Sequence, residues 1–401
     1  MTVIDLVYFN AGGGHRAAAL ALAEAIGAQG RPWEIRLVNL FEVLDPRDRF
    51  QRATGMKPEA YYNARLKRGW TIGLSQELRI LQGLIRLGHR RLVAQLTNHW
   101  RASAPDLVVS LVPNFNRAMY AALAQARPGA GYVTVLTDFA DFPPHFWIER
   151  GQDQHLVCGT ARAVAQAKAA GYADHRIHPV SGMIIRPSFY AVPPFDRDAE
   201  MVRLGLDPRR PTGVVTFGGQ GSRAMRSIAR RLAEFQLILL CGHNRRLAER
   251  LRKVSKARAH VVVEFTPRVQ EYLRLADFCI GKPGPGSISE AVQMGLPMIV
   301  ARNAWTMPQE RYNADWIVEN DVGVVLESFR GVREAVEQLL EGRERQAGRA
   351  RAIRNRAVFE IPAILAKVIE ERERATVAAS GRRVVAAAAG RNGGRIAAVF
   401  P

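Results

Sequence analysis

Short apolar runs alternate with longer amphipathic segments along most of this 401-residue chain. The apolar runs are nearly continuous in Val, Ile and Leu, which is typical of strands that are buried on both faces of a parallel sheet. Strands that alternate with helices predict an α/β protein with doubly wound sheets. The predicted strands cover residues 3–9, 33–39, 107–111, 132–136, 155–158 and 178–180, and then 213–217, 235–241, 260–264, 278–281 and 297–300.

The alternation restarts in the second half of the chain, which predicts two Rossmann-like domains facing a central cleft. Residues 186–211 contain five prolines and are expected to be the linker between a first domain, 1–185, and a second domain, 212–345. A C-terminal helix is expected over 346–375. The remainder, 376–401, is rich in Ala, Val, Gly and Arg and contains no acid, so it is expected to be a basic, poorly ordered tail.

Residues 57–101 interrupt the α/β alternation. Leucines and isoleucines recur there near helical spacing, which predicts one or two amphipathic helices. The segment has nine basic residues and two acids, and it also contains Trp70, Tyr61 and Tyr62. Cations, aromatic rings and an apolar face together suit a membrane interface. An ordinary surface helix of the first domain explains the pattern equally well.

The composition limits the class of protein without choosing a function. The formal net charge of +20, mostly from arginine, favours nucleic acid, anionic lipid or anionic substrates as partners. No apolar run approaches the ~20 residues of a membrane-spanning helix. The chain enters a strand pattern at once, so we expect no signal peptide. Three widely separated cysteines predict neither a disulfide framework nor a metal cluster, and a cytoplasmic location is expected.

The most informative stretch is residues 282–299, a Gly/Pro-rich loop that opens a helix and leads into a strand. Gly284 and Gly286 allow a ligand to approach the backbone closely. Ser287 is expected to cap the helix, whose free N–H groups can bind a phosphate. Glu290, about one turn further, can accept hydrogen bonds from two neighbouring hydroxyls. A phosphate site next to a diol acceptor describes a nucleotide pocket, although many such turns bind nothing.

A second candidate turn follows the first strand, where Gly13 and Gly14 precede His15. Ligands of open α/β sheets bind at the carboxyl ends of strands, so His15 is expected to face the cleft. A nearby helix N-terminus keeps an imidazole neutral and able to accept a proton. Asp138, at the end of another strand, is expected to orient His15 or to bind a hydroxyl. A hydrogen bond to the loop backbone and a structural cap are the alternatives for these two side chains.

Three further groups complete the candidate site. The turn made by Gly218, Gly219, Gly221 and Ser222 can hold a pyrophosphate, but it lacks the spacing of a dinucleotide-binding fingerprint. Gln309 and Glu310 can hold sugar hydroxyls. We find no D-x-D motif for a metal beside a sugar diphosphate, so cations such as Arg186 are expected to balance the phosphate charge. No metal and no cofactor are predicted.

Together these motifs resemble a known family. Residues 10–18 resemble the N-terminal loop of monogalactosyldiacylglycerol synthases, and residues 137–147, 182–188, 282–291 and 308–310 resemble later blocks of that family in the same order. The chain is similar, more distantly, to the transferase that adds N-acetylglucosamine in peptidoglycan synthesis. The resemblance spans about residues 3–325. It departs from the family at Gln220 and in residues 303–307, which leaves the sugar open.

The resemblance implies an inverting GT-B glycosyltransferase that uses a UDP-sugar. His15 or Asp138 would be the catalytic base, and Gly218–Ser222 and Ser287 would hold the diphosphate. Glu290 would bind the ribose, Gln309 and Glu310 the sugar, and Arg186 the phosphate charge. The expected reaction moves galactose or glucose to diacylglycerol on the inner face of the plasma membrane.

Two alternatives remain open from the sequence. One is an enzyme that transfers N-acetylglucosamine from its UDP-sugar to another lipid-linked acceptor. The other is a basic nucleic-acid-binding protein, which would use the charge of +20 but for which we find no recognised motif.

Overall fold

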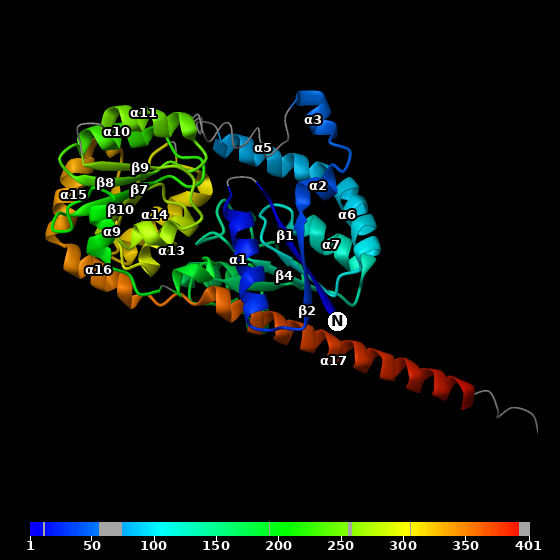
Figure 1. Ribbon diagram of the computed structural model, residues 1–401. Coiled ribbons are helices and arrows are strands. Elements are labelled where there is room, and N and C mark those ends of the chain that lie inside the picture. The colour runs from blue at the N-terminus through cyan, green and yellow to red at the C-terminus, as the bar shows by residue number, and fades with distance from the viewer. Residues whose placement is uncertain (11–12, 56–73, 192, 256–258, 305, 393–401) are drawn as a thin grey trace, which may run out of the picture.

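Two six-stranded parallel sheets organise the molecule, one in each half of the chain (Figure 1). The computed structural model describes residues 1–10, 13–55, 74–191, 193–255, 259–304 and 306–392. The strand order is β2-β1-β3-β4-β5-β6 in the N-terminal sheet and β12-β11-β10-β7-β8-β9 in the C-terminal sheet. The prediction of an α/β protein with two Rossmann-like domains is therefore confirmed.

The N-terminal sheet is apolar on both faces. One face packs on α1 and on the start of α17, where Leu22 and Leu365 join Leu6 in a buried cluster. The other face packs on α2, α6 and α7 around Trp100 and Met119. The strands are β1 Thr2–Tyr8, β2 Trp33–Asn39, β3 Leu107–Ser110, β4 Gly131–Val135, β5 His155–Cys158 and β6 Ile177–Pro179. The helices are α1 Gly14–Ala28, α2 Leu40–Leu44, α3 Arg49–Thr54, α5 Leu74–Leu87, α6 His89–Ser103, α7 Asn116–Ala126 and α8 Ala161–Ala169, with the 3-10 turn η1 Asp174–Arg176.

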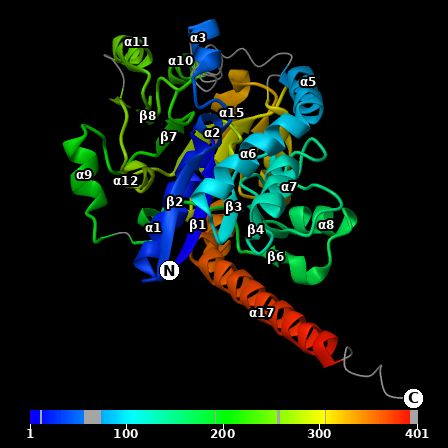
Figure 2. The same ribbon diagram turned by 90° about the vertical axis from the view of Figure 1, so that its right-hand side faces the viewer.

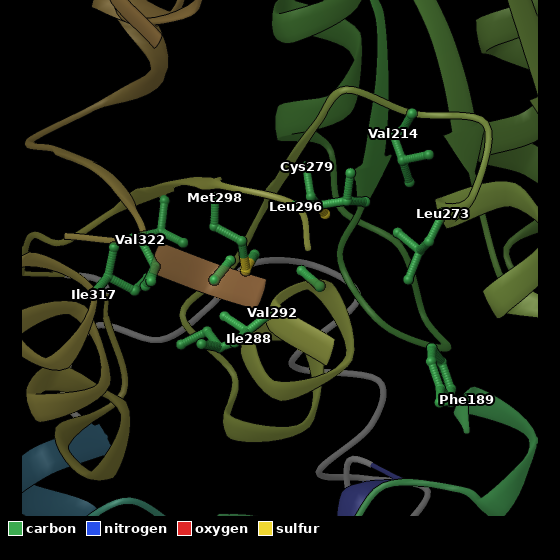
Figure 3. Packing of buried hydrophobic residues seen from close by; sticks show 14 of the residues in the cluster. Phe189, Val214, Leu273, Cys279, Ile288, Val292, Leu296, Met298, Ile317 and Val322 are labelled. Carbon is green, nitrogen blue, oxygen red and sulfur yellow. The ribbon is translucent and has the colours of Figure 1, made fainter. Parts of the chain in front are cut away.

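The C-terminal sheet is also covered on both faces. Figure 3 shows one of its two cores, in which Ile288 and Val292 of α13 pack beside Met298 of β11 and Val322. The strands are β7 Thr212–Thr216, β8 Gln236–Leu240, β9 His260–Val263, β10 Phe278–Gly281, β11 Met298–Ala301 and β12 Gly323–Leu326. The helices are α9 Arg197–Arg203, α10 Ala224–Arg231, α11 Arg245–Ser255, α12 Val269–Leu273, α13 Pro285–Gln293, α14 Arg311–Glu319, α15 Val332–Glu341 and α16 Arg343–Ala352, with 3-10 turns η2 Pro187–Phe189, η3 Pro308–Glu310 and η4 Phe329–Gly331.

The segment 186–211, which its five prolines predict to be the linker, packs on the second domain. It connects β6 of the first sheet to β7 of the second, but it contains η2 and α9. Its apolar side chains Phe189, Met201 and Leu206 are buried in the core of the C-terminal domain. The prolines prevent a long helix here, while the apolar residues between them still bind the segment to that domain.

The C-terminus differs from the prediction. α17 covers Ala357–Asn392, so the helix continues through residues 376–392, which were expected to be poorly ordered. The run of alanines explains this difference, because alanine has the highest helix propensity. The start of α17 returns to the first domain, where Ile361, Leu365 and Val368 are buried against the N-terminal sheet. The last helix therefore packs on the first domain, although it follows the second domain in the sequence.

The basic segment 57–101 is described in part. Residues 56–73, which include Tyr61, Tyr62 and Trp70, lie outside the described residues. The remainder forms α5 and α6, as the apolar spacing predicts. α6 buries Leu96 and Trp100 on the N-terminal domain, whereas α5 leaves Leu84 and Leu87 exposed. Within the described part of the chain, we find no helix with the length and apolar character that crossing a bilayer requires.

Candidate active site between the two domains

His15 lies at the carboxyl end of β1, where the first candidate turn leads into α1. The residue before the helix, Gly13, has a φ of 85°, a left-handed conformation that costs glycine little and other residues more. Gly14 then begins α1, and the space at its Cα is open, with no atom within 4 Å of a built Cβ. The backbone of Gly13 and Gly14, which has no side chain to cover it, thus lies next to His15 at the carboxyl end of β1.

The His15 ring is held by groups from the segments that follow β1 and β4. Its Nδ1 lies 3.2 Å from the Oγ1 of Thr137, and its ring centroid lies 6.3 Å from that of Phe9 and 5.9 Å from that of Trp147. Burial lowers the pKa of His15 to about 4, a hydrogen bond with the Leu111 backbone acts to raise it, and the positive charge of Lys282 lowers it further. The imidazole is therefore neutral at pH 7, as predicted. The main cause is burial, and the expected effect of the helix terminus is not needed.

Asp138 lies beside His15, but its structural partner is a different group. Its Oδ2 accepts a hydrogen bond from the indole Nε1 of Trp147 at 3.0 Å. The side chain that contacts His15 is Thr137, so the expectation that Asp138 orients His15 is replaced by orientation through Thr137. Burial raises the pKa of Asp138 to about 7, although the bond from Trp147 acts in the opposite direction. A carboxyl group with this pKa can either donate or accept a proton near neutral pH.

The motif 282–291 in the C-terminal domain forms the turn between β10 and α13. The helix begins at Pro285, with Gly284 as the N-cap residue and no side-chain cap. Ser287 is thus the third residue of α13, and the prediction that it caps the helix is wrong. Proline at the first position is common because it has no N–H to satisfy there. The N–H groups of Gly286 and Ser287 belong to the first turn and have no partner within the helix, and no atom lies within 4 Å of a built Cβ at Gly286.

Glu290 follows one turn later on α13. Burial raises the pKa of its carboxyl group to about 7, and the positive charge of Arg186 acts to lower it. Arg186 itself donates from Nη1 to the carbonyl oxygen of Pro267 at 2.8 Å. The structure therefore places Arg186, which comes from the connection between the domains, close enough to influence the helix that carries Glu290.

The second glycine turn follows β7 and packs against the loop after β8. Gly218 and Gly221 have φ values of 73° and 60°. A Cβ at Gly221 would come within 2.9 Å of the carbonyl oxygen of Cys241, so the two loops pack too closely for any side chain there. Gly219 accepts a hydrogen bond from the backbone N–H of His243 at 2.8 Å. The Oγ of Ser222 accepts from the backbone N–H of Ala224 at 3.2 Å, at the start of α10.

Lys282 connects the two halves of the site, a role that no sequence pattern indicated. Its Nζ lies 2.6 Å from the Oε1 of Glu310, which is buried at the end of η3, just before α14, next to the half-buried Gln309. The charge of Lys282 also lowers the pKa of both His15 and Asp138, so the lysine lies near residues of the opposite domain. A single lysine at the start of a loop carries no distinctive sequence signal, and only the fold shows these neighbours.

A second feature that sequence reasoning missed is an aromatic pair beside the glycine turn. The rings of His243 and Phe265 stack with centroids 3.9 Å apart and an interplanar angle of 16°. His243 adjoins Gly219, and Phe265 is 56% exposed. A hydrophobic residue left this exposed at the carboxyl ends of β8 and β9 offers a flat surface to a planar ligand.

The two halves of the site have different chemistry. The N-terminal half-site consists of His15, Thr137, Asp138 and Trp147, and the C-terminal half-site consists of Lys282, Glu290, Gln309, Glu310 and the two glycine turns. Within the described ranges, no three His, Cys, Asp or Glu side chains form a group that could hold a metal ion. A cavity of about 720 Å³ lies elsewhere, under α17 at the amino ends of β1 and β3. Ligands of open α/β sheets bind at the opposite, carboxyl ends.

Comparison with known proteins agrees with this arrangement. Residues 214–363 match the model of the glycosyltransferase family 28 C-terminal domain. The chain is 26% identical over 347 residues to monogalactosyldiacylglycerol synthase 1 of Arabidopsis thaliana, an alignment that covers 82% of this chain and 62% of the plant protein. This chain therefore spans less than two thirds of that relative's length.

Solved structures show the same fold at low sequence identity. WaaG, a glycosyltransferase involved in lipopolysaccharide biosynthesis, superposes with a TM-score of 0.52 at 18% identity, covering 92% of this chain and 99% of WaaG. MurG of Acinetobacter baumannii superposes with a TM-score of 0.54 at 12% identity, covering 91% of this chain and 99% of MurG. The chain thus has the GT-B glycosyltransferase fold, its residues 214–363 match the glycosyltransferase family 28 C-terminal domain, and its sequence is similar to that of the monogalactosyldiacylglycerol synthases.

Proposed function

We propose that this protein is an inverting glycosyltransferase that moves galactose or glucose from a UDP-sugar to diacylglycerol and forms a β-glycolipid. The observation that carries the proposal is the pairing of half-sites. A neutral His15 in the N-terminal domain lies close enough to Lys282 of the C-terminal domain for that charge to lower its pKa. Lys282 pairs with Glu310 and comes just before α13, which carries Glu290 and whose first-turn N–H groups have no partner within the helix. Similarity to a plant monogalactosyldiacylglycerol synthase supports a lipid acceptor.

In the proposed reaction, the acceptor hydroxyl gives its proton to a ring nitrogen of His15. Its oxygen then forms a bond to the anomeric carbon of the sugar, and the bond from that carbon to the UDP oxygen breaks. UDP leaves from the opposite face of the sugar, so the configuration inverts. Thr137 orients the imidazole through its contact with Nδ1, and Trp147 and Phe9 exclude water from one side of the ring. Holding both substrates in line supplies much of the rate by removing the entropy of encounter.

The C-terminal half-site is proposed to hold the UDP-sugar. The first-turn N–H groups of α13, at Gly286 and Ser287, and the backbone of Gly218–Ser222 would bind the diphosphate. Lys282 and Arg186 would neutralise the charge that develops on the leaving UDP. Glu290 would accept hydrogen bonds from the ribose hydroxyls. Its raised pKa implies that binding weakens as the pH falls below about 7, where the carboxylate gains a proton.

The sugar and the uracil ring of the donor would contact residues next to the two glycine turns. Gln309 and Glu310 would contact the sugar hydroxyls, and the stacked His243 and Phe265 offer a face for the uracil ring. In this proposal, Lys282 keeps the buried Glu310 neutralised while the donor is absent. No metal and no further cofactor are needed for these steps.

We further propose that α5 holds the enzyme against the inner face of the plasma membrane. Ile80, Leu84 and Leu87 recur at helical spacing and are 62%, 60% and 86% exposed. Arg79 and Arg86 are exposed on the same helix, next to Arg90 and Arg91 on α6. An apolar row flanked by arginines suits the boundary between acyl chains and headgroups.

A donor panel tests the function. The purified protein is incubated with diacylglycerol and radiolabelled UDP-galactose, UDP-glucose or UDP-N-acetylglucosamine, and the lipid products are separated. We expect a glycolipid from one of the two hexose donors and none without diacylglycerol. Transfer from UDP-N-acetylglucosamine alone would establish the alternative donor, and no glycolipid from any donor would contradict the lipid acceptor.

A further inference from the structure

The outer helices of the C-terminal domain form a second strongly basic surface. α10 and α11 together carry eight basic residues and one acid, Glu249. Their apolar residues, among them Ile228 and Leu251, are buried in the core beneath. Because the apolar side of each helix is buried, the opposite side, which carries most of the arginines, is exposed to solvent.

Most of this charge has no protein counter-charge. Arg245 and Arg252 share Glu264, with N–O distances of 3.8 Å and 2.9 Å. The other exposed cations on the two helices make no ion pair with any described residue: Arg230, Arg231, Arg246, Arg250 and Lys253. Residues 246, 250 and 253 recur at intervals of four and three, so their side chains form one row along α11.

The position of these helices links them to the proposed membrane contact. In Figure 1, α10 and α11 lie at the upper end of the C-terminal domain, and α3 and α5 lie at the upper end of the N-terminal domain. Figure 2 is turned about the vertical axis, and all four helices remain at that end. α17 runs at the opposite end in both views. The helices that carry the exposed apolar row (α5) and the basic row (α11) thus lie at the same end of the molecule.

We propose that the α10–α11 basic surface, made by Arg230, Arg231, Arg246, Arg250 and Lys253, binds the anionic headgroups of the same membrane that α5 enters. This inference rests on the proposed function, because it extends the lipid contact to the domain that holds the donor. Nucleic acid also attracts arginine rows, but it offers nothing to the exposed leucines of α5 at the same end. An anionic bilayer complements both the apolar and the basic parts of this end.

The consequence is a two-domain attachment. With only α5 at the bilayer, the C-terminal domain could turn freely relative to the lipid. A second contact through α11 holds both half-sites at a fixed height above the headgroups. Attachment of this kind raises the effective concentration of the second contact once the first is made.

Matched charge removal tests the proposal on the full-length protein. The triple variant R246Q/R250Q/K253Q removes the row on α11, and R349Q/R351Q/R354Q removes three exposed cations in and just after α16. Neither set includes a residue of the proposed active site, and both lower the net charge equally. Binding is measured by co-sedimentation with phosphatidylcholine vesicles that contain 30% or no phosphatidylglycerol. Thermal unfolding verifies that both variants are folded.

We expect the α11 variant to bind the anionic vesicles roughly 10- to 100-fold more weakly than the wild type, and the α16 variant to change little. Equal losses in both variants would reduce the effect to net charge and overturn the proposal. Unchanged vesicle binding in the α11 variant would also overturn the proposal. If the α11 variant alone also lost binding to a duplex DNA probe, the surface would be assigned to nucleic acid. Transfer to diacylglycerol in neutral detergent micelles is measured in parallel. Wild-type activity there, with unchanged vesicle binding, would contradict this surface alone and leave the proposed function standing.

Discussion

The two halves of the candidate site differ in the charged groups that they present. In the N-terminal half-site, Asp138 is buried and His15 is half-buried beside Trp147 and Phe9, and burial moves the pKa values of both groups toward their neutral forms. Burial also raises the pKa of Glu290 in the C-terminal half-site, but this half presents helix N–H groups and the cation Lys282, with Arg186 nearby, which favour negative charge. The first arrangement suits the movement of a proton, and the second suits the binding of an anion.

This difference assigns the two tasks of a glycosyl transfer to separate domains. A neutral imidazole can accept a proton only if no permanent negative charge fixes it as imidazolium, and here its contact is the neutral Thr137. A diphosphate needs donors that do not change charge during the reaction. Lys282 is the exception to the separation, because its charge acts on groups in both domains.

Removal of the proposed base should have the largest effect. His15→Ala is expected to lower kcat by roughly 10²- to 10⁴-fold, the usual contribution of general base catalysis. The Michaelis constant for the donor should stay within about twofold, because His15 belongs to the half-site that does not bind UDP in this account. Steady-state kinetics measures both values. Normal turnover in the variant would remove His15 from the mechanism.

Loss of Lys282, the cation that acts on both half-sites, should have a smaller effect, on the affinity for UDP. Lys282→Met is expected to weaken UDP binding by roughly 10- to 100-fold, since a hydrogen bond from a charged group is lost and Glu310 keeps an unpaired charge. Lys282→Arg, which keeps the charge, is the control and should recover part of the affinity. Calorimetric titration with UDP measures these losses. Full affinity in Lys282→Met would place the lysine outside the donor site.

The pH profile of kcat separates the two candidate bases. The pKa of His15 is about 4 and that of Asp138 is about 7. At saturating donor, kcat should stay level as the pH falls from 8 to 5 if His15 takes the proton. If Asp138 takes it, kcat should fall about tenfold for each pH unit below 7, because the protonated carboxyl group cannot accept another proton. The second profile would move the base to Asp138.

The smallest expected effect concerns Asp5, a carboxyl group outside the candidate site whose pKa is also raised. Asp5 lies in the middle of β1, and its two buried carboxyl oxygens accept no hydrogen bond from the described residues. Burial raises its pKa to about 6. Its charge therefore costs stability, and this cost appears as the pH rises from about 4 through 6. Asp5→Asn should increase the free energy of unfolding by about 2–3 kcal/mol at pH 8 and by less at pH 5. Urea unfolding at both pH values measures the difference.

Turnover in Asp5→Asn should equal that of the wild type. A stability gain without a change in turnover would establish that a buried, raised carboxyl pKa alone does not identify a catalytic group in this protein. Reduced turnover would connect the interior of β1 to the half-site at its carboxyl end.

The periodic features of the chain could be predicted from its sequence, and the contacts between distant segments could not. Alternating apolar runs placed the strands β1 to β11 but missed β12, the edge strand at Gly323–Leu326. The His15 turn and the Glu290 helix follow the carboxyl ends of β1 and β10, as the apolar runs before them predict. Ser287 was assigned as a cap because serine is favoured there, but Pro285 sets the helix start two residues earlier. Lys282 and the stacked His243–Phe265 pair acquire meaning only from neighbours far away in the sequence.

The central claim is that proton transfer and donor binding reside in different domains. The most direct measurement is a calorimetric titration of UDP into His15→Ala and Glu290→Ala, with turnover measured on the same preparations. The account predicts that His15→Ala binds UDP as tightly as the wild type and turns over roughly 10²- to 10⁴-fold more slowly, whereas Glu290→Ala loses UDP binding. Equal UDP affinity in the two variants, or normal turnover in His15→Ala, would contradict it.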